Sequence, residues 1–406
     1  MFNLTVLVII LMTLFDITLS YLNYSYRNKK LPKNVEDLYS EEEYKKWLDY
    51  NMERRKIGIL ESIFSTVVLL IFLYSGFFVK IANFSSTFSD NYITQNLLFL
   101  LIYFIISYIL SIGFDIYKTF SIEERYGFNK STVKTFILDQ IKSIILTVII
   151  GGGLLFIIFY FHSNLKESFI IYSWLIVFSV VMIVNLLYTK VFIKIFNELK
   201  PLEENELYTK ILELGKSTGY KISEISVLDA SKRSSRLNAF FSGFSKFKQI
   251  VLYDTLVEKF DDEEILGVLA HEIGHYRHKD IIKNIVISIV QITAIIGILS
   301  FFFSYSPLSQ SFGFNQVHYG FTLIIFSILA QPILTFIGVP LNYISRKAEY
   351  KADAFACKHV DKRYLISALK KLSKENFSNL NPHPLVVTLT YSHPPLHKRL
   401  KSIKNK

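Results

Sequence analysis

Long apolar stretches, separated by polar segments of unequal length, recur along the whole chain. A helix needs about 20 such residues to cross the roughly 30 Å of hydrocarbon in a bilayer. Seven stretches are long enough, and they lie approximately at 3–22, 58–80, 96–117, 138–161, 169–195, 282–304 and 320–341. This pattern predicts a mostly α-helical membrane protein with about seven transmembrane helices.

The first stretch has the position of a secretory signal peptide without its other marks. No basic residue precedes the apolar run, and no small-residue cleavage pattern follows Leu22. We therefore expect this stretch to be retained as a membrane span.

The spans divide the chain into four parts. Residues 1–196 form a five-span membrane region with polar loops, and residues 281–341 form a hairpin of two more spans. The remaining parts, 197–280 and 342–406, are polar enough to fold outside the membrane. Because the hairpin returns the chain to the side that it left, we expect these two parts to meet as halves of one domain.

The two polar parts differ in their secondary-structure pattern. Residues 197–280 favour helix, then short strands around 224–229 and 249–254, then helix again. Residues 342–406 favour a helix through about 372, followed by an irregular, proline-rich end. Together they predict a small α+β domain beside the membrane helices.

The basic residues alternate along the chain in step with the spans. Of the 45 lysines and arginines, 39 fall in the segments 21–57, 118–135, 197–280 and 342–406. The segments between them contain only Lys166, and they are 81–95, 162–168 and 305–319. Because basic loops stay in the cytosol, this alternation predicts that the N-terminus is outside and that both polar parts are cytosolic.

Composition narrows the class of protein further. Hydrophobic residues make up 51% of the chain and charged residues 19%, which is too apolar for a soluble chain of 406 residues. The single cysteine, Cys357, excludes an internal disulfide framework. The net charge of +11 comes without a nucleic-acid-binding motif, so we expect the basic surface to face anionic membrane lipid and to bind no nucleic acid.

Residues 271–275 read His-Glu-Ile-Gly-His, a pattern that indicates a metal site. On a helix, His271 and His275 lie one turn apart on the same face, so two imidazoles can share one zinc ion. Glu272 lies beside them, where its carboxylate can take a proton from water. We expect one Zn2+ per chain in a catalytic site.

A catalytic zinc site needs a third protein ligand and keeps its fourth position open. His278 lies on the same helix and would not brace the site from a second element, so we predict Glu349 as the third ligand. Asp353, one helical turn further, is expected to orient a ligand imidazole. If the helix over 262–280 continues into the sixth span, both ligand helices extend membrane helices and hold the metal at the membrane surface.

Several segments resemble the zinc-dependent CAAX prenyl endopeptidase family, type I. They are HEIGH (271–275), AEYKADAFA (348–356), SHPPLHKRL (392–400), EERYGFNKS (123–131) and SRLNAFFSGFSKFKQIVLYDTL (235–256). The resemblance covers most of the chain and implies seven spans with a cytosolic-face, zincin-like α+β catalytic domain split by the last two spans. It also implies a zinc metalloendopeptidase that acts on C-terminally prenylated proteins.

The resemblance assigns roles to residues outside the metal motif. Asn238 and Ala239 match an edge segment that holds the substrate backbone as an added strand. His393 and Arg399 match a pair that stabilises the oxyanion of the tetrahedral intermediate. The plain alternatives are a turn residue at Asn238 and a solvated loop histidine at His393. In this scheme Glu272 passes a proton from water to the leaving amine, and no covalent intermediate forms.

Two other functions stay open at this point. A quality-control metalloprotease of broad specificity, which cuts misfolded membrane proteins, would carry the same motif and need no prenylated substrate. A transporter or scaffold would leave the zinc residues without a role, and no pair of broken spans recurs in the two halves of the chain. The expected partner is therefore a peptide or protein, with or without a C-terminal prenyl group. The expected membrane is a bacterial plasma membrane or that of the endoplasmic reticulum.

Overall fold

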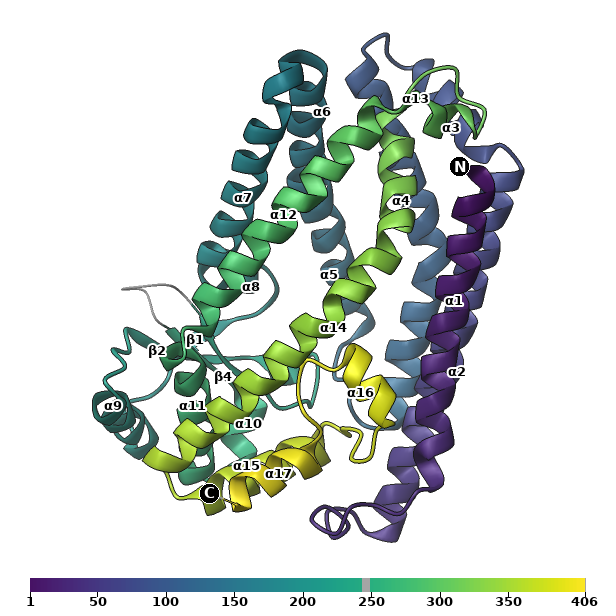
Figure 1. The fold of residues 1–406 in the computed structure, drawn as a ribbon. Coiled ribbons are helices and arrows are strands. Elements are labelled where there is room, and N and C mark those ends of the chain that lie inside the picture. The colour runs from purple at the N-terminus through teal and green to yellow at the C-terminus, as the bar shows by residue number, and fades with distance from the viewer. Residues whose placement is uncertain (243–248, 406) are drawn as a thin grey trace.

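The structure, a computed structural model, describes residues 1–242 and 249–405. Within these ranges, seven helical segments are long and apolar enough to cross a membrane, which confirms the predicted number (Figure 1). They are formed by α1 (Phe2–Ser25), α2 (Glu41–Tyr74), α4 (Tyr92–Tyr117), α5 with α6 (Val133–Leu146 and Gly153–Leu165), α7 with α8 (Phe169–Leu187 and Ile193–Phe196), α12 (Asp280–Ser304) and α14 (Tyr319–His359). The third, fourth and fifth spans continue through π-helical turns at Lys118–Glu123, Thr147–Gly152 and Tyr188–Phe192.

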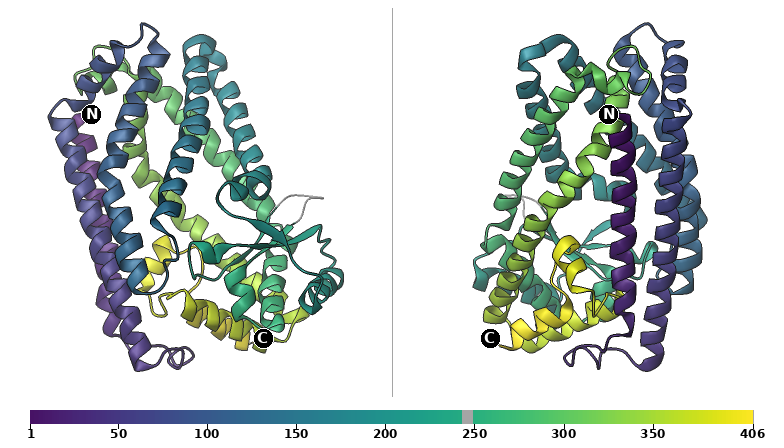
Figure 2. Two further views of the ribbon diagram at one scale, coloured as in Figure 1. Left: turned by 180° about the vertical axis from the view of Figure 1, so that it is seen from behind. Right: turned by 45° about the vertical axis from the view of Figure 1, so that its right-hand side comes forward.

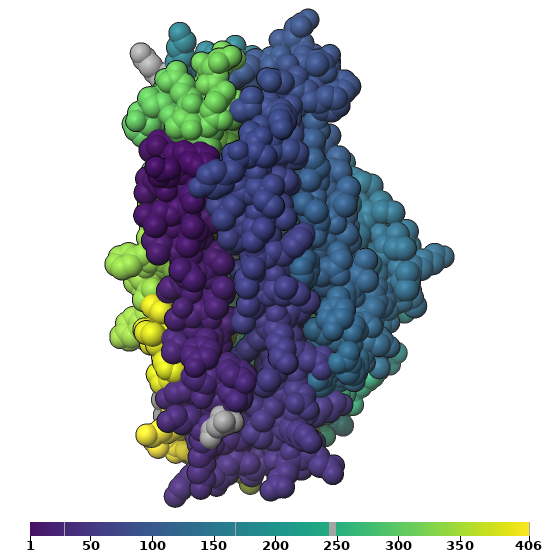
Figure 3. Space-filling model, turned by 90° about the vertical axis from the view of Figure 1, so that its right-hand side faces the viewer, coloured from purple at the N-terminus to yellow at the C-terminus, as the bar shows by residue number. Residues whose placement is uncertain are grey.

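The spans stand alongside one another, with a small sheet and its helices at one end (Figures 1 and 2). α1 packs against both α2 and α14, so the first, second and seventh spans are neighbours. Much of the face drawn in Figure 3 is made of α1 and α2. The N-terminus lies at the far end of the spans from the sheet, and the C-terminus lies at the sheet end (Figure 1).

The second span ends earlier than the hydrophobic pattern predicts. The apolar run extends to about residue 80, whereas α2 ends at Tyr74 and α3 (Phe77–Ser86) follows it directly. Gly76 lies between them with a φ of +66°, in the left-handed region that glycine adopts without steric cost. The chain turns there, and α3 packs against α4. The short helix α13 (Ser306–Gln310) lies near α3 at the same end of the molecule (Figure 1).

Among the described residues, the sheet has four strands in the order β1-β2-β4-β3. Their bounds are β1 (Leu199–Pro201), β2 (Glu224–Leu228), β3 (Ala239–Ser242) and β4 (Gln249–Tyr253). β2 and β4 match the strands predicted near 224–229 and 249–254, and they pair in parallel, whereas both edge strands pair antiparallel. The middle of the 235–256 motif, residues 243–248, lies outside the described residues.

One hydrophobic core joins the sheet to the helices around it. The helices are α9 (Glu206–Thr218), α10 (Asp254–Lys259), α11 (Asp262–Arg277), α15 (Lys362–Glu375) and α17 (Leu396–Lys404), whereas α16 (Pro384–Thr390) packs against α14. Buried Ile250, Ile265 and Leu269 come from the first polar part, and buried Ala356 and Leu365 come from the second. The two parts therefore share one core, although two membrane spans separate them in the sequence.

The second polar part contains more helices than its sequence suggests. The helix predicted through about residue 372 ends at His359, and α15 begins afresh after Asp361, whose side chain caps it. The end expected to be irregular forms α16 and α17. Their prolines, Pro384 and Pro395, stand at or just before the first helical turn, where the missing N–H of proline costs no hydrogen bond.

Candidate metal centre

The helix that carries both motif histidines, α11, is fixed at its start and along its length. Asp261 caps it, and Glu264 accepts a hydrogen bond from the backbone N–H of Asp261, as in a capping box. Ile265 and Leu269 are fully buried in the core. The first turns of α11 are thus held by local hydrogen bonds and its length by packing.

α11 and α14 approach within backbone contact beside the motif. A Cβ built on Gly274 would lie 2.9 Å from the Cα of Ala352, closer than side chains tolerate. The glycine inside His-Glu-Ile-Gly-His therefore permits the approach that brings α14 to the two histidines.

α14 runs as one helix from the membrane into the domain (Figure 1). Pro332 and Pro340 lie within it, as prolines do in membrane helices whose freed carbonyls find other partners. Glu349 and Asp353 stand on this extension of the seventh span, one turn apart, and their residues are 4% and 0% exposed. The site is therefore attached directly to a membrane helix.

The sixth span does not continue the motif helix, so the condition considered above, a helix over 262–280 that runs on into the sixth span, is not met. α11 ends at Arg277, and α12 begins at Asp280. Lys279 lies between them with a φ of +57°, in the left-handed conformation that interrupts a right-handed helix. The break turns the first residue of α12 toward the motif, where Asp280 Oδ2 lies 3.0 Å from Nδ1 of His275.

Three side chains converge between α11 and α14 with the spacing of metal ligands. Nε2 of His271 lies 3.3 Å from Nε2 of His275. Glu349 places Oε1 3.2 Å from Nε2 of His275 and Oε2 3.5 Å from Nε2 of His271. Ligands held about 2.0–2.2 Å from a tetrahedral zinc ion lie about 3.3–3.6 Å from one another. The observed separations match this requirement.

The carboxylate of Glu349 also has an unsatisfied oxygen. Its Oε2 is buried and accepts no hydrogen bond from the residues that the structure describes. A buried carboxylate oxygen that accepts no hydrogen bond costs free energy, and a divalent cation among His271, His275 and Glu349 would lower that cost. Two imidazoles and one carboxylate are a donor set that zinc prefers. The residues present therefore fit a zinc ion.

Each histidine has a carboxylate at its second ring nitrogen. Asp353 Oδ1 lies 2.9 Å from Nδ1 of His271, and Asp280 stands in the same relation to His275. A proton on Nδ1, donated to the carboxylate, leaves Nε2 free to bind a metal and fixes the orientation of the ring. Both rings are thus held in one orientation with Nε2 facing the same point.

Sequence reasoning named Asp353 for this position and missed Asp280. On a straight helix a residue five places after His275 would lie about 140° around the axis, pointing away from the metal. The sequence does contain a signal for Asp280. It is the acidic residue that ends the polar run before the sixth span, and an acidic residue is favourable at the start of a helix.

The carboxylates also shift the protonation of both imidazoles. Burial alone would lower the pKa of His275, but hydrogen bonds to Glu349 and Asp280 outweigh it and raise the pKa to about 9. For His271, too, burial lowers the pKa and the adjacent carboxylates raise it, with a net rise. A metal ion bound at Nε2 takes the place of these protons.

The metal centre lines a cavity of about 330 Å³. Glu272 faces this cavity, together with apolar side chains of α15 such as Leu365 and Leu369. Among the described residues, no side chain donates a hydrogen bond to the Glu272 carboxylate. Its oxygens are therefore available to a water or a substrate in the cavity.

The C-terminal segment brings two further residues to the same cavity. His393 Nε2 lies 3.3 Å from Glu349 Oε1, and its side chain is 66% exposed, so a substrate can reach it. Arg399, on α17, forms a two-pronged pair with Asp353, at 3.0 Å from Nε and 2.6 Å from Nη2. Its remaining nitrogen, Nη1, lies 3.3 Å from Glu349 Oε2. The guanidinium thus braces both carboxylates of α14.

Asn238 and Ala239 line the cavity at the start of β3. Ala239 pairs with Leu252 of β4 on one side, and β3 has no strand on its other side within the described sheet. The Asn238 carbonyl accepts from Tyr253, so this residue is tied to the sheet and does not stand in a free loop. An extended peptide can pair with such an edge.

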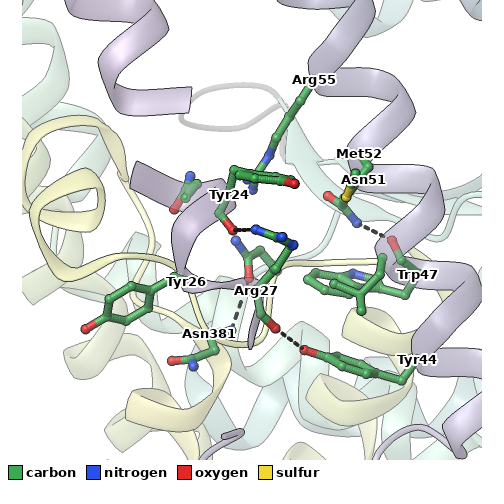
Figure 4. A pocket seen from close by; sticks show the side chains of 12 residues that line it. Tyr24, Tyr26, Arg27, Tyr44, Trp47, Asn51, Met52, Arg55 and Asn381 are labelled. Atoms are coloured by element: carbon green, nitrogen blue, oxygen red, sulfur yellow. Dashed lines mark hydrogen bonds between the residues drawn. The ribbon is translucent and has the colours of Figure 1, made fainter. Parts of the chain in front are cut away.

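A second hollow lies away from the metal centre, between the end of α1 and the first turns of α2 (Figure 4). Arg27 lies over the ring of Tyr24, 3.6 Å from its centroid, and Tyr44 donates to the Arg27 carbonyl. Its volume of about 20 Å³ suits one water molecule, so we regard it as a packing feature of the first loop. The cavity at the metal centre is large enough for part of a peptide.

Two family models match nearly the whole chain. The model described as CAAX prenyl protease N-terminal, five membrane helices, matches residues 20–198, and that of peptidase family M48 matches residues 201–406.

Whole-chain relatives give the same result. The CAAX prenyl protease 1 homolog of Arabidopsis thaliana is 33% identical over 92% of this chain and 90% of its own length. CAAX prenyl protease 1 of Saccharomyces cerevisiae is 32% identical over 95% and 91%, and the Homo sapiens homolog is 30% identical over 92% and 88%. The crystal structure of S. mikatae Ste24p superimposes with a TM-score of 0.93 at 31% identity, covering 99% of this chain and 98% of that one.

Proposed function

Since the chain belongs to peptidase family M48 and is an integral-membrane metalloendopeptidase, we propose that it holds one zinc ion through His271, His275 and Glu349 and cleaves C-terminally prenylated proteins. The observation that carries the zinc assignment is the spacing of the three ligand atoms, with Glu349 Oε2 buried and unbonded. The substrate class is supported by the relatives, which are named CAAX prenyl proteases.

A zinc ion held by His271, His275 and Glu349 would supply a Lewis acid that acidifies water and polarises the scissile carbonyl. Glu272 is placed to take the proton of the attacking water and to deliver it to the leaving amine. Its unbonded carboxylate in the cavity supports this role. Asp353 and Asp280 hold the Nδ1 protons of His271 and His275, so that both Nε2 lone pairs point inward.

The oxyanion of the tetrahedral intermediate needs donors that are in place before the reaction. His393 is exposed in the cavity and is the donor that can contact it directly. Arg399 commits two of its nitrogens to Asp353, so we assign it a positive charge near the oxyanion and the bracing of α14. In this proposal His393 therefore contacts the oxyanion directly, and Arg399 stabilises it from a greater distance.

The substrate backbone pairs with the free edge of β3 in this proposal. Asn238 and Ala239 stand where that edge meets the metal cavity, which would bring the bound peptide bond beside Glu272. The two polar parts act as one catalytic domain on the cytosolic side of the membrane. The alternation of basic loops supports this sidedness and places anionic lipid around the domain.

Metal content and peptide cleavage, measured on the detergent-purified protein and on Glu272→Gln, test the proposal. One substrate is a farnesylated CAAX peptide and the other is its unprenylated twin. We expect close to one zinc per chain in both proteins and cleavage by the wild type alone, with the farnesylated peptide preferred.

Two results would count against it. Absence of zinc, or equal cleavage by Glu272→Gln, would remove the assigned metal site and general base. Equal cleavage of both twins would leave the peptidase in place and support a broad-specificity, quality-control role instead.

A further inference from the structure

A mostly apolar cavity of about 370 Å³ lies where α7, β3 and α12 meet. Nine of the side chains that line it are apolar or aromatic, among them Met182, Phe240 and Ile285, and four are polar. Its volume falls within the range of about 300–1,000 Å³ that is typical of ligand pockets. We propose that this cavity binds the isoprenoid chain of the substrate, an inference that rests on the proposed function.

The cavity adjoins a second cavity, which reaches the metal centre, through shared wall residues. Asn284 and Ser288 of α12 line both this cavity and a neighbouring polar one of about 460 Å³. That polar cavity reaches His275 and Glu349, which also line the cavity of Glu272. A polar route for peptide thus adjoins an apolar recess, which is the pair of environments that a lipid-modified peptide requires.

The separation from the metal agrees with the position of a prenyl group in a CAAX tail. The prenylated cysteine is followed by three residues, so its backbone lies within about 10 Å of any bond in the tail at about 3.3 Å per residue. Asp280 contacts His275, and Asn284 lies one helical turn, about 6 Å, further along α12. The recess therefore begins within reach of the modified side chain.

The direction of β3 favours the same recess. Ala239 lines the metal cavity, and the strand then runs through Phe240 and Phe241 into the wall of the apolar recess. A substrate strand that pairs antiparallel, the more stable arrangement, places the residues that precede the cleaved bond beside Phe240–Ser242. The prenylated residue and those before it would thus lie along the recess, and the released tail would lie on the other side.

A larger apolar cavity of about 630 Å³ does not meet the distance requirement. It is lined by Leu323 and Ser327 of α14. Along that helix, Ser327 lies about 33 Å from Glu349 at 1.5 Å per residue, far beyond the reach of a prenyl chain attached near the cleaved bond. The smaller recess is therefore the one that can serve the substrate.

Filling the recess tests the assignment with a matched control. Met182→Trp places an indole inside it, whereas Ile183→Trp makes the same change at the next residue, which is 53% exposed and outside the recess. We expect Met182→Trp to lower kcat/KM for the farnesylated peptide at least ~10-fold, mainly through KM, the size of effect that altered fit in an apolar pocket produces. The unprenylated twin should be cleaved unchanged by Met182→Trp, and both peptides unchanged by Ile183→Trp.

An equal loss for both peptides in Met182→Trp, or no loss for either, would overturn the inference. So would equal kcat/KM for the two peptides in the wild type, a result that leaves the peptidase itself intact. Cleavage of neither peptide by the wild type would instead refute the proposed function.

A second measurement does not depend on the folding of a variant. A peptide whose isoprenoid carries a photoreactive diazirine is bound to the wild-type protein in nanodiscs, irradiated and mapped by mass spectrometry. We expect the label on 178–186 or 281–288, and competition by the farnesylated peptide but not by its twin. Label confined to other segments, or to lipid, would contradict the assignment.

Discussion

Asp280 and His275 are joined across a helix break, with the carboxylate of the first 3.0 Å from Nδ1 of the second. Lys279 makes the break by adopting a left-handed conformation. Lys283, one turn into the new helix, lies 2.7 Å from the other oxygen of Asp280 and fixes the carboxylate. An acid outside the His-Glu-Ile-Gly-His pattern thus orients the second imidazole, as Asp353 orients the first.

Asp280→Asn should weaken zinc binding by about 10–100-fold, the usual effect of removing a carboxylate behind a ligand histidine. The amide can present its NH2 to Nδ1, which favours the wrong tautomer of His275. Zinc affinity is measured by competition with a chromophoric chelator. Asp90→Asn changes an exposed residue in the turn between α3 and α4; it is the control for the charge change and should bind zinc normally. Unchanged affinity in Asp280→Asn would show that the contact does not orient the ligand.

His393→Ala should lower kcat by about 10²–10³-fold, the range for losing one oxyanion donor, while zinc content stays near one per chain. Steady-state cleavage and metal analysis on the same preparation separate the two effects. His359→Ala, which alters a histidine at the end of α14 beyond the cavity, should retain full activity. Loss of zinc in His393→Ala would instead indicate that the residue supports the metal site.

Glu264→Gln should destabilise the protein by about 1.5–3 kcal/mol, the range for hydrogen bonds to a charged group. Glu264 is buried on α11 and is bonded to Lys371 at 2.6 Å and Ser367 at 2.5 Å on α15. Glu263→Gln removes a neighbouring carboxylate that forms a surface pair, and it should change stability by less than about 0.5 kcal/mol. Thermal unfolding in detergent measures both variants, and equal shifts would argue against a special role for the buried pair.

The same carboxylate predicts a pH dependence. Burial raises the pKa of Glu264, but hydrogen bonds from Lys371 and Ser367 outweigh it and hold the pKa below its ordinary value of 4.5. Because the folded pKa is lower than the unfolded one, this stabilisation is complete above about pH 4.5 and is lost as the pH falls through the folded value. As the pH falls from about 4.5 toward the folded pKa, the unfolding temperature should therefore decrease less steeply for Glu264→Gln than for the wild type.

Removal of zinc should lower the unfolding temperature and abolish cleavage, and added zinc should restore both. The three proposed zinc ligands lie on α11 and α14, and a metal present at 1,000 times its dissociation constant stabilises the folded state by about 4 kcal/mol. Unfolding is followed with and without a chelator, using Glu349→Gln as the reference. A chelator effect of the same size in that variant would mean that the stabilising metal lies elsewhere.

The features that sequence predicts well here are those set by long runs and short motifs. The seven spans follow from the apolar stretches, and the resemblance to the CAAX prenyl endopeptidase family is confirmed by the comparisons. Glu349 and Asp353 stand near the motif histidines because one helix carries both and their spacing is a single turn. Such regular helical periodicity can be recognised in the amino-acid sequence alone.

The features that sequence analysis missed depend on single backbone angles or on tertiary pairing. A lysine in the sequence does not indicate a left-handed backbone conformation, so the break at Lys279 and the contact of Asp280 with His275 could not be predicted. β3 has four residues, two of them phenylalanine, and becomes a strand by pairing with β4. The proline-rich end was predicted to be irregular, whereas Pro384 and Pro395 stand at helix starts, where proline is favourable.

Because α14 runs as one helix from the seventh span to Glu349, a change in bilayer thickness can change the position of Glu349. From Tyr319 to Glu349 the helix measures about 45 Å, so each degree of tilt about its outer end displaces Glu349 by about 0.8 Å. Transmembrane helices adjust their tilt when hydrocarbon thickness and hydrophobic length differ. The joint at Lys279 separates α11 from α12, whereas α11 packs directly against α14 at Gly274 and Ala352. A change in membrane thickness that tilts α14 would therefore carry α11 with it, so that His271, His275 and Glu349 move together and keep their spacing.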